Sequence, residues 1–165
     1  MRLQQIMQKY QKYQHILLVI SVLFIFFFTF IARETMNIRH SENRGLSLIP
    51  FREYVAMFKN DNHSFFFRQI FLNILLFVPF GYTFTAVLTE TRKVRKKHFM
   101  LNGCLTVLIA GFIFSFGIEL LQYVTSLGYS EIDDVINNTI GAAVGYLLYK
   151  QTMWFCGKRK EKITK

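Results

Sequence analysis

Four long apolar runs divide the chain, and they cover about residues 16–32, 65–89, 99–127 and 132–155. A helix needs roughly 20 apolar residues to cross the hydrocarbon core of a bilayer, and each run approaches or exceeds that length. Continuous runs of this kind are typical of integral membrane proteins rather than soluble domains. We therefore predict an all-α fold, a small polytopic bundle of four transmembrane helices in one domain across residues 1–165.

The first run has two interpretations. Residues 16–32 could form a signal peptide, but the run ends in bulky Phe residues, and Phe30 occupies a position where a cleavage site needs a small residue. We interpret it as a retained first helix.

The polar segment 33–64 is predicted to be an outer loop that contains a short helix. After Pro50, which suits a helix start, apolar residues recur at helical spacing: Phe51, Tyr54, Val55 and Phe58. This stripe favours an amphipathic helix lying in the membrane interface. The alternative is an ordinary loop helix packed on the bundle.

Several residues have structural roles in the predicted helices. Pro79 cannot donate a backbone hydrogen bond, which predicts a kink or a local opening in the second helix, and Gly81 beside it permits close approach. In the fourth helix, Gly141 and Gly145 form a small-xxx-small pattern typical of tight helix contacts.

Polar residues that are unfavourable in lipid gather on both sides of the turn between the third and fourth helices. A carboxylate at the bilayer centre costs at least about 2.5 kcal/mol, so such groups usually face protein, water or a ligand. On the third helix, Ser115, Glu119 and Gln122 share one face. The residues that we predict to bind a ligand at this outer end of the bundle are Arg68, Asn73, Glu119, Gln122, Asp133, Asp134, Asn137 and Asn138.

Each of these residues also has a simpler explanation. Asp133 and Asp134 could cap the fourth helix, where its dipole favours negative charge. Arg68 could extend toward lipid headgroups, and Gln122 or Asn138 could join helices through hydrogen bonds. Glu119, which lies among apolar residues, has the strongest claim to a function.

Charge predicts the topology. The formal net charge is +10, and residues 1–14, 90–98 and 150–165 hold three, five and six Lys and Arg residues, whereas the turn 126–131 holds none. The positive-inside rule then places both termini and the basic tail 156–165 in the cytoplasm of a multi-pass cell-membrane protein. The five basic residues of the outer loop 33–64 depart from this rule.

Other classes of chemistry have little support in the sequence. The basic clusters flank apolar runs and carry no nucleic-acid recognition motif, so we expect membrane lipids and no nucleic acid as partners. Cys104 and Cys156 are not placed for a disulfide, and no paired His or Cys motif suggests a metal. We expect no metal and no cofactor.

Four segments resemble the VanZ-like family of membrane proteins. They are LSLIPF (46–51), FFRQIFLNILLFVPFGY (66–82), SFGIELLQY and EIDDVINNTIGAAVGY, in the order and spacing of the family. The resemblance implies a link with resistance to teicoplanin, a lipid-anchored glycopeptide. The family motif positions that occur here are Arg68, Asn73, Pro79, Gly81, Glu119, Gln122, Asp134, Asn138 and Gly141. Many relatives have an Arg in the turn before the acidic pair, but residues 127–130 contain none.

Three functions remain open at this point. The outer cluster could bind or shield a lipid-linked ligand, such as a cell-wall precursor or an acylated glycopeptide. Glu119 and Asp134 could instead be the acid–base pair of an intramembrane enzyme that acts on a lipid headgroup. The chain could also be a transporter or assembly subunit, which predicts a homo-oligomer with Gly141 and Gly145 at the contact.

Overall fold

A computed structural model describes residues 13–32, 46–59, 63–93, 100–125 and 130–163. Helices dominate these residues, and two strands of two residues each accompany them. In chain order the elements are α2 (Gln14–Phe27), the π-helical segment η1 (Phe28–Ala32), β1 (Leu46–Ser47), α4 (Arg52–Lys59), α5 (His63–Lys93), α6 (Met100–Thr125), β2 (Ser130–Glu131) and α7 (Ile132–Ile163).

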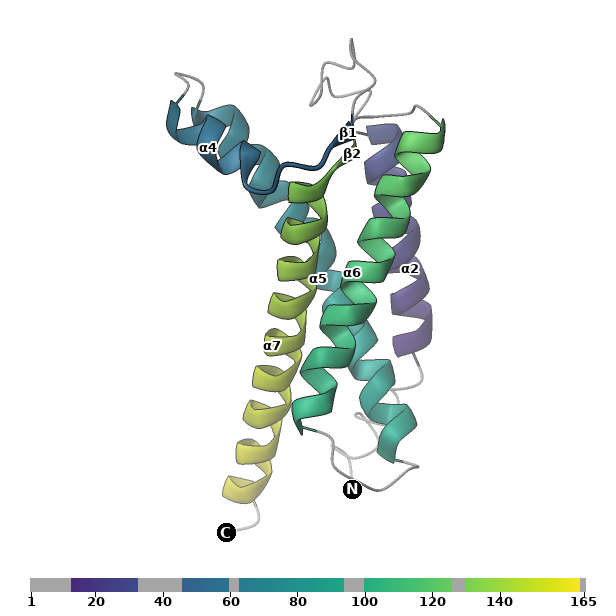
Figure 1. Cartoon of the computed structure of the whole chain (residues 1–165). Helices are drawn as coiled ribbons and strands as arrows, with labels where there is room; N and C mark the ends of the chain where they lie inside the picture. Colours follow the sequence, from purple (N-terminus) through teal and green to yellow (C-terminus); the bar gives the residue numbers. More distant parts are fainter. Residues whose placement is uncertain (1–12, 33–45, 60–62, 94–99, 126–129, 164–165) are drawn as a thin grey trace.

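Four helices form the bundle, with α2, α5, α6 and α7 extended along one common direction (Figure 1). The chain descends through α5, rises through α6 and descends again through α7, so α5 and α7 run parallel. The α5–α7 contact is the most extensive in the molecule, followed by the α6–α7 contact. Short α4 packs against α5 and lies at the end of the bundle where α7 begins.

Three of the four predicted spans are confirmed as helices that are long and apolar enough to cross a membrane. They are Gln14–Ile31, Phe67–Glu90 and Gly103–Thr125, with mean hydropathies of 2.4, 1.9 and 2.2. The fourth helix, α7, has 32 residues but does not reach the same apolar threshold. Polar residues along the helix contribute to this result: Asp133, Asp134, Asn137 and Asn138 in the first turns, and Lys150 and Gln151 further on.

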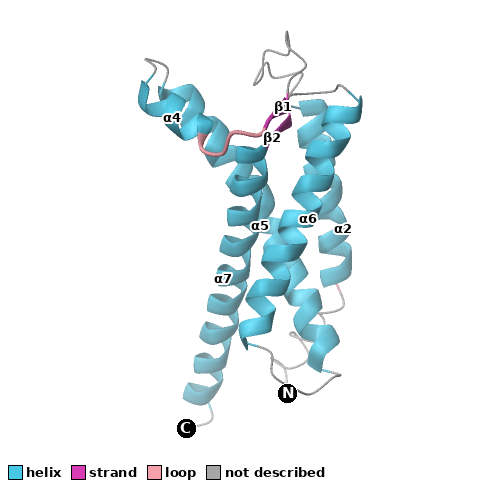
Figure 2. Ribbon diagram, in the orientation of Figure 1, coloured by secondary structure: helices cyan, strands magenta, loops and turns pink. Residues whose placement is uncertain are grey.

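The structure differs from the sequence-based prediction in several local features. Helix α7 continues to Ile163, so most of the basic tail 156–165 is helical. Helix α4 begins at Arg52, two residues after the predicted start at Pro50. Helix α5 is one helix through Pro79, and the kink expected there stays a prediction. The parallel bridge between β1 and β2 was not predicted (Figure 2).

Glycine residues set the distance between α5 and α7. A Cβ atom added to Gly145 would lie 2.2 Å from the carbonyl oxygen of Val78, and one added to Gly141 would lie 2.1 Å from that of Ile74. From the other side, a Cβ on Gly81 would lie 2.1 Å from the carbonyl oxygen of Ala142. The small-xxx-small pattern therefore makes a tight contact, as predicted, and it makes that contact within the chain.

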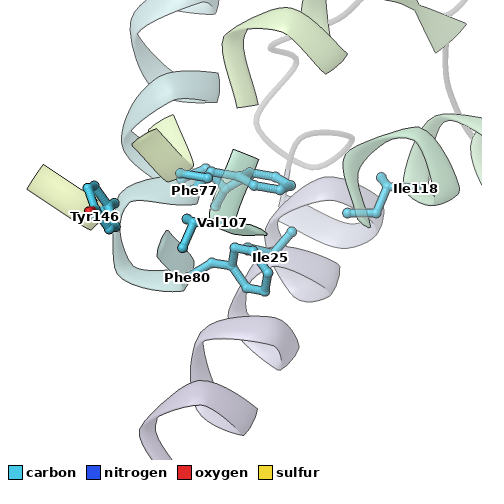
Figure 3. Packing of buried hydrophobic residues seen from close by; sticks show 8 residues of the cluster. Ile25, Phe77, Phe80, Val107, Ile118 and Tyr146 are labelled. Carbon is cyan, nitrogen blue, oxygen red and sulfur yellow. The ribbon is translucent and has the colours of Figure 1, made fainter. Parts of the chain in front are cut away.

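The apolar core lies where the four long helices meet. Ile25 of α2, Phe77 and Phe80 of α5, Val107 and Ile118 of α6, and Tyr146 of α7 belong to one cluster of buried residues (Figure 3). Phe114 joins three helices, because its ring centroid lies 5.9, 5.6 and 5.1 Å from those of Phe26, Phe77 and Phe80. Such aromatic contacts hold the bundle together below its polar end.

Candidate functional site

The parallel bridge brings two distant segments together at one end of the bundle. Leu46 pairs with Ser130 and Ser47 pairs with Glu131, so the chain that precedes α4 lies beside the start of α7. Figure 2 shows the two strands at this end, next to the first turn of α7. The bridge thereby places α4 and its flanking residues around the polar turns of α7.

The first two turns of α7 reach three other elements through hydrogen bonds. Asp134 accepts a hydrogen bond from the Asn73 amide on α5, and the Asn138 amide donates to Ser115 of α6 at 2.8 Å. The Tyr54 hydroxyl on α4 donates to Asn137. Because these contacts leave the helix in different directions, the polar end of α7 organises the surrounding helices.

Asp133 holds the chain at the entrance to α4. Its carboxylate accepts a hydrogen bond from the backbone N–H of Phe51. Phe51 has a φ of 63°, a conformation that is uncommon for a residue other than glycine. A charge-assisted bond at this point stabilises the turn that directs α4 away from the bundle.

Glu119 lies in a second part of the polar end, between α6 and the start of α7. Its carboxylate accepts the backbone N–H of Glu131 at 3.0 Å. When the Gln122 amide nitrogen faces Glu119, it lies 3.2 Å from both carboxylate oxygens. Gln69 of α5 donates to the Glu131 carboxylate at 3.4 Å. Helices α5 and α6 and strand β2 therefore converge on these two carboxylates.

We name these residues together the polar cluster. It consists of Tyr54, Gln69, Asn73, Ser115, Glu119, Gln122, Glu131, Asp133, Asp134, Asn137 and Asn138. All the cluster residues predicted from sequence on α6 and α7 are buried: Glu119 is 4% exposed, and Asp134 and Asn137 are 0% exposed. Asn73 of α5 is 1% exposed.

Arg68 is placed differently from the other predicted binding residues. Its side chain is exposed on α5, five residues before the buried Asn73. The adjacent Gln69 is buried instead and reaches Glu131. Arg68 is thus exposed, whereas the other predicted binding residues are buried.

Four members of the cluster were not among the predicted binding residues: Tyr54, Gln69, Ser115 and Glu131. Tyr54 was assigned to an amphipathic stripe, Gln69 was not selected, and Ser115 was placed on the right helix face without a role. Helical spacing could have identified Gln69, because this residue lies four positions before Asn73 and therefore shares its helix face. No local signal could identify Asn137 as the partner of Tyr54, which lies 83 residues earlier.

Two buried amide atoms in the cluster have no hydrogen-bond partner within the described part of the chain. They are Nδ2 of Asn137 and Oδ1 of Asn138. Buried polar atoms are nearly always paired, so each exception needs an explanation. One buried donor and one buried acceptor at the polar end thus lack a partner among the described residues.

A groove opens beside the carboxylates. Its volume is about 220 Å³, and it runs between α6, the strand bridge and the start of α7. We name it the Glu119 groove, and its described lining residues are Leu46, Leu48, Phe116, Glu119, Leu120, Tyr123, Ser130, Glu131, Ile132 and Val135. The lining is mostly apolar, and the two glutamates supply its charge.

The described residues show no arrangement of side chains suited to a metal ion. No group of three or more His, Cys, Asp and Glu side chains is placed there to hold a metal ion. The carboxylates instead accept hydrogen bonds from amides and backbone N–H groups. The arrangement can therefore present acceptors, donors and negative charge to a bound molecule.

Comparison with known proteins identifies the family. The model of the VanZ/LLP1 family matches residues 15–155. The chain therefore belongs to the VanZ/LLP1 family of membrane proteins. It is also similar to Protein VanZ of Enterococcus faecium, with 30% identity over 83 residues that make up 50% of this chain and 45% of that protein. The similarity thus spans less than half the length of this relative. No solved structure matches the chain.

Proposed function

We propose that this VanZ/LLP1 protein binds a lipid-linked or acylated ligand at the polar end of its bundle, on the outer side of the membrane. The observation that carries the proposal is the burial of Glu119, Asp133 and Asp134 at the end of an otherwise apolar bundle. At the bilayer centre a carboxylate would cost on the order of 2.5–3.5 kcal/mol. Groups so costly in lipid usually serve a ligand or an ion path.

The unpaired amide atoms support binding more than a purely structural role. Hydrogen bonds between helices would account for Asn73, Ser115 and Asp134. They do not account for the remaining donor on Asn137 or the remaining acceptor on Asn138. A ligand that offers both a hydroxyl or carbonyl and an N–H, such as a sugar or a peptide amide, would pair with both atoms.

The proposed topology has four membrane spans with both termini in the cytoplasm. A helix of 32 residues is about 48 Å long, so α7 has enough length to cross. Its close contact with α5 at Gly141 and Gly145 would hide its less apolar face from lipid. Helix α4, with Val55 and Phe58 exposed, would then lie in the outer interface.

Cysteine labelling tests this topology. After replacement of Cys104 and Cys156, single cysteines at positions 94 and 129 should be reached from the cytoplasmic and outer sides respectively. A membrane-impermeant maleimide added to intact cells should label position 129 alone. Labelling of both positions under these conditions would refute four spans with internal termini.

The family resemblance connects the proposed site with resistance to glycopeptide antibiotics. A ligand site at the boundary between acyl chains and headgroups would favour glycopeptides that carry an acyl chain. Expression of the chain in a susceptible Gram-positive host should therefore raise resistance to teicoplanin, while resistance to the non-acylated vancomycin should change little. Equal protection against both antibiotics would contradict binding through the acyl chain.

A further inference from the structure

We propose that the last turns of α7 bind the headgroups of anionic phospholipids, and that Trp154 and the lysines around it form the binding face. This inference goes beyond the proposed function, because it concerns the end of the bundle opposite the polar cluster. In Figure 1, α7 reaches farther at this end than α5 or α6 does. We name the basic face of α7 for the four residues Lys150, Trp154, Lys158 and Lys162.

The charges of the chain are divided unequally between the two ends of the bundle. The segments that adjoin the end where α7 finishes are residues 1–14, 90–98 and 150–165, and they hold 14 of the 20 Lys and Arg residues. They hold only two acids, Glu90 and Glu161, since the other eight acids belong to loop 33–64 or to the polar cluster. Because two carboxylates cannot neutralise fourteen cations, these segments keep a large positive charge that attracts an anionic partner.

Helical spacing collects lysines and the tryptophan on one side of α7. The four residues of the basic face follow one another at intervals of four positions in an unbroken helix. Residues four apart are neighbours on a helix surface. The Lys150 ammonium lies 6.0 Å from the centroid of the Tyr146 ring, one turn nearer the centre of the bundle. Trp154 therefore has a basic position on each side of it along the same face.

The aromatic residues indicate that the anionic partner is a lipid. Trp154 is 53% exposed, and its ring forms an edge-to-face pair with the exposed Phe155, with the centroids 4.9 Å apart. Trp side chains are enriched at membrane interfaces, where the ring contacts acyl chains and the N–H meets the headgroups. Lys158 follows about 6 Å farther along the helix, at the level of the headgroups. A phospholipid thus offers apolar surface to the rings and negative charge to the lysines, whereas a soluble polyanion offers only the charge.

Fluorescence quenching tests the inference at this position, because Trp154 is the only tryptophan in the chain. The full chain would be reconstituted in bilayers with equal parts of phosphatidylglycerol and phosphatidylcholine, and one lipid or the other would carry bromine atoms on its acyl chains. Bromine quenches a nearby indole, so the two samples report which lipid adjoins Trp154. We expect phosphatidylglycerol to be favoured there by about fivefold. The preference should fall toward one in about 1 M salt, where the Debye length is about 3 Å.

Two sets of substitutions with the same change in net charge localise the preference. The first set combines Lys158→Gln, Arg159→Gln, Lys160→Gln and Lys162→Gln, and it should reduce the preference below about twofold. The control set removes four charges from the segment that adjoins the opposite end, with Arg33→Gln, Arg39→Gln, Arg44→Gln and Lys59→Gln. This control should leave the quenching ratio unchanged.

Several results would overturn the inference. Equal quenching by the two lipids at low salt, or a preference that salt does not reduce, would refute anionic lipid binding without the use of any variant. A preference that survives the first set, or that the control set reduces equally, would refute the assignment to α7. A response of Trp154 to an added oligonucleotide, without a lipid preference, would assign the basic face of α7 to nucleic acid instead. None of these results bears on the proposed function, which concerns the polar cluster.

Discussion

Helix α7 contacts the bundle in two different ways along its length. In its first two turns, Asp134, Asn137 and Asn138 reach α5, α4 and α6 through side-chain hydrogen bonds. One to two turns further on, Gly141 and Gly145 have no side chain, and their backbone packs directly against the α5 backbone. The first region positions polar side chains, whereas the second sets the distance between α5 and α7.

This difference teaches which changes should affect folding and which should affect function. Where two helix backbones touch at a glycine, the packing cannot adjust to an added side chain, because backbone atoms cannot rotate away as side-chain atoms can. A hydrogen-bonded polar group can be replaced by a neutral group of the same shape with little change in packing. Substitutions in the two regions should therefore separate the amount of protein from its activity.

The largest effect is expected for Gly145→Leu. The Cβ atom alone would approach the Val78 carbonyl oxygen to 2.2 Å, so α5 and α7 would have to separate. We expect a loss of at least about 3 kcal/mol in stability, with little protein remaining in the membrane. Thermal unfolding in detergent and quantitative immunoblotting of membranes would measure both quantities.

Gly117→Leu is the matched control for that substitution. Gly117 also lies within a long helix, but a Cβ atom there would have no heavy atom within 4 Å. If Gly117→Leu is present at normal abundance and Gly145→Leu is lost from the membrane, the close contact between α5 and α7 is required for stability. Normal stability of Gly145→Leu would mean that α5 and α7 do not pack as described.

The second effect concerns the polar region, where Glu119→Gln and Asp134→Asn should each abolish function while membrane abundance stays nearly intact. Both changes keep the shape of the side chain and remove its charge, and neutralising a buried acid relieves part of its desolvation cost. Resistance per unit of membrane protein would be compared with Glu90→Gln, which removes a carboxylate near the opposite end of α5. If Glu119→Gln were fully active at normal abundance, the polar cluster would have no functional role centred on that residue.

A smaller effect is expected for Tyr54→Phe, which removes the hydroxyl that donates to Asn137. The lost hydrogen bond should reduce the attachment of α4 to α7 by about 1 kcal/mol. Amide hydrogen exchange in residues 52–59 should then be faster, with the rest of the bundle unchanged. Phe58→Ala, which alters an exposed position on the same helix, provides the comparison. Equal acceleration in both variants would show that the hydroxyl does not hold α4 in place.

The smallest effect is expected for Arg68→Gln, because an exposed side chain usually contributes within about 0.5 kcal/mol. Combined with Glu119→Gln, its effect on unfolding free energy should be additive within about 0.5 kcal/mol. A buried ion pair between the two residues would instead produce strong coupling in this double-mutant cycle.

The sequence by itself determined the helical class, the family and the position of the polar end along each helix. Helical periodicity is a local property, so it correctly placed Ser115, Glu119 and Gln122 on one face and predicted a tight contact at Gly141 and Gly145. Length and hydropathy are also properties of the sequence, and they identified three of the membrane spans directly.

Only the tertiary structure decided which helix each face meets. It directed the glycines of α7 toward α5, paired Tyr54 with Asn137, and buried Gln69 while it left Arg68 exposed. It also formed the Glu119 groove from residues of β1, α6, β2 and α7. The physical reason is that side-chain spacing specifies a face within one helix, whereas the partner of that face depends on how all the helices pack at once.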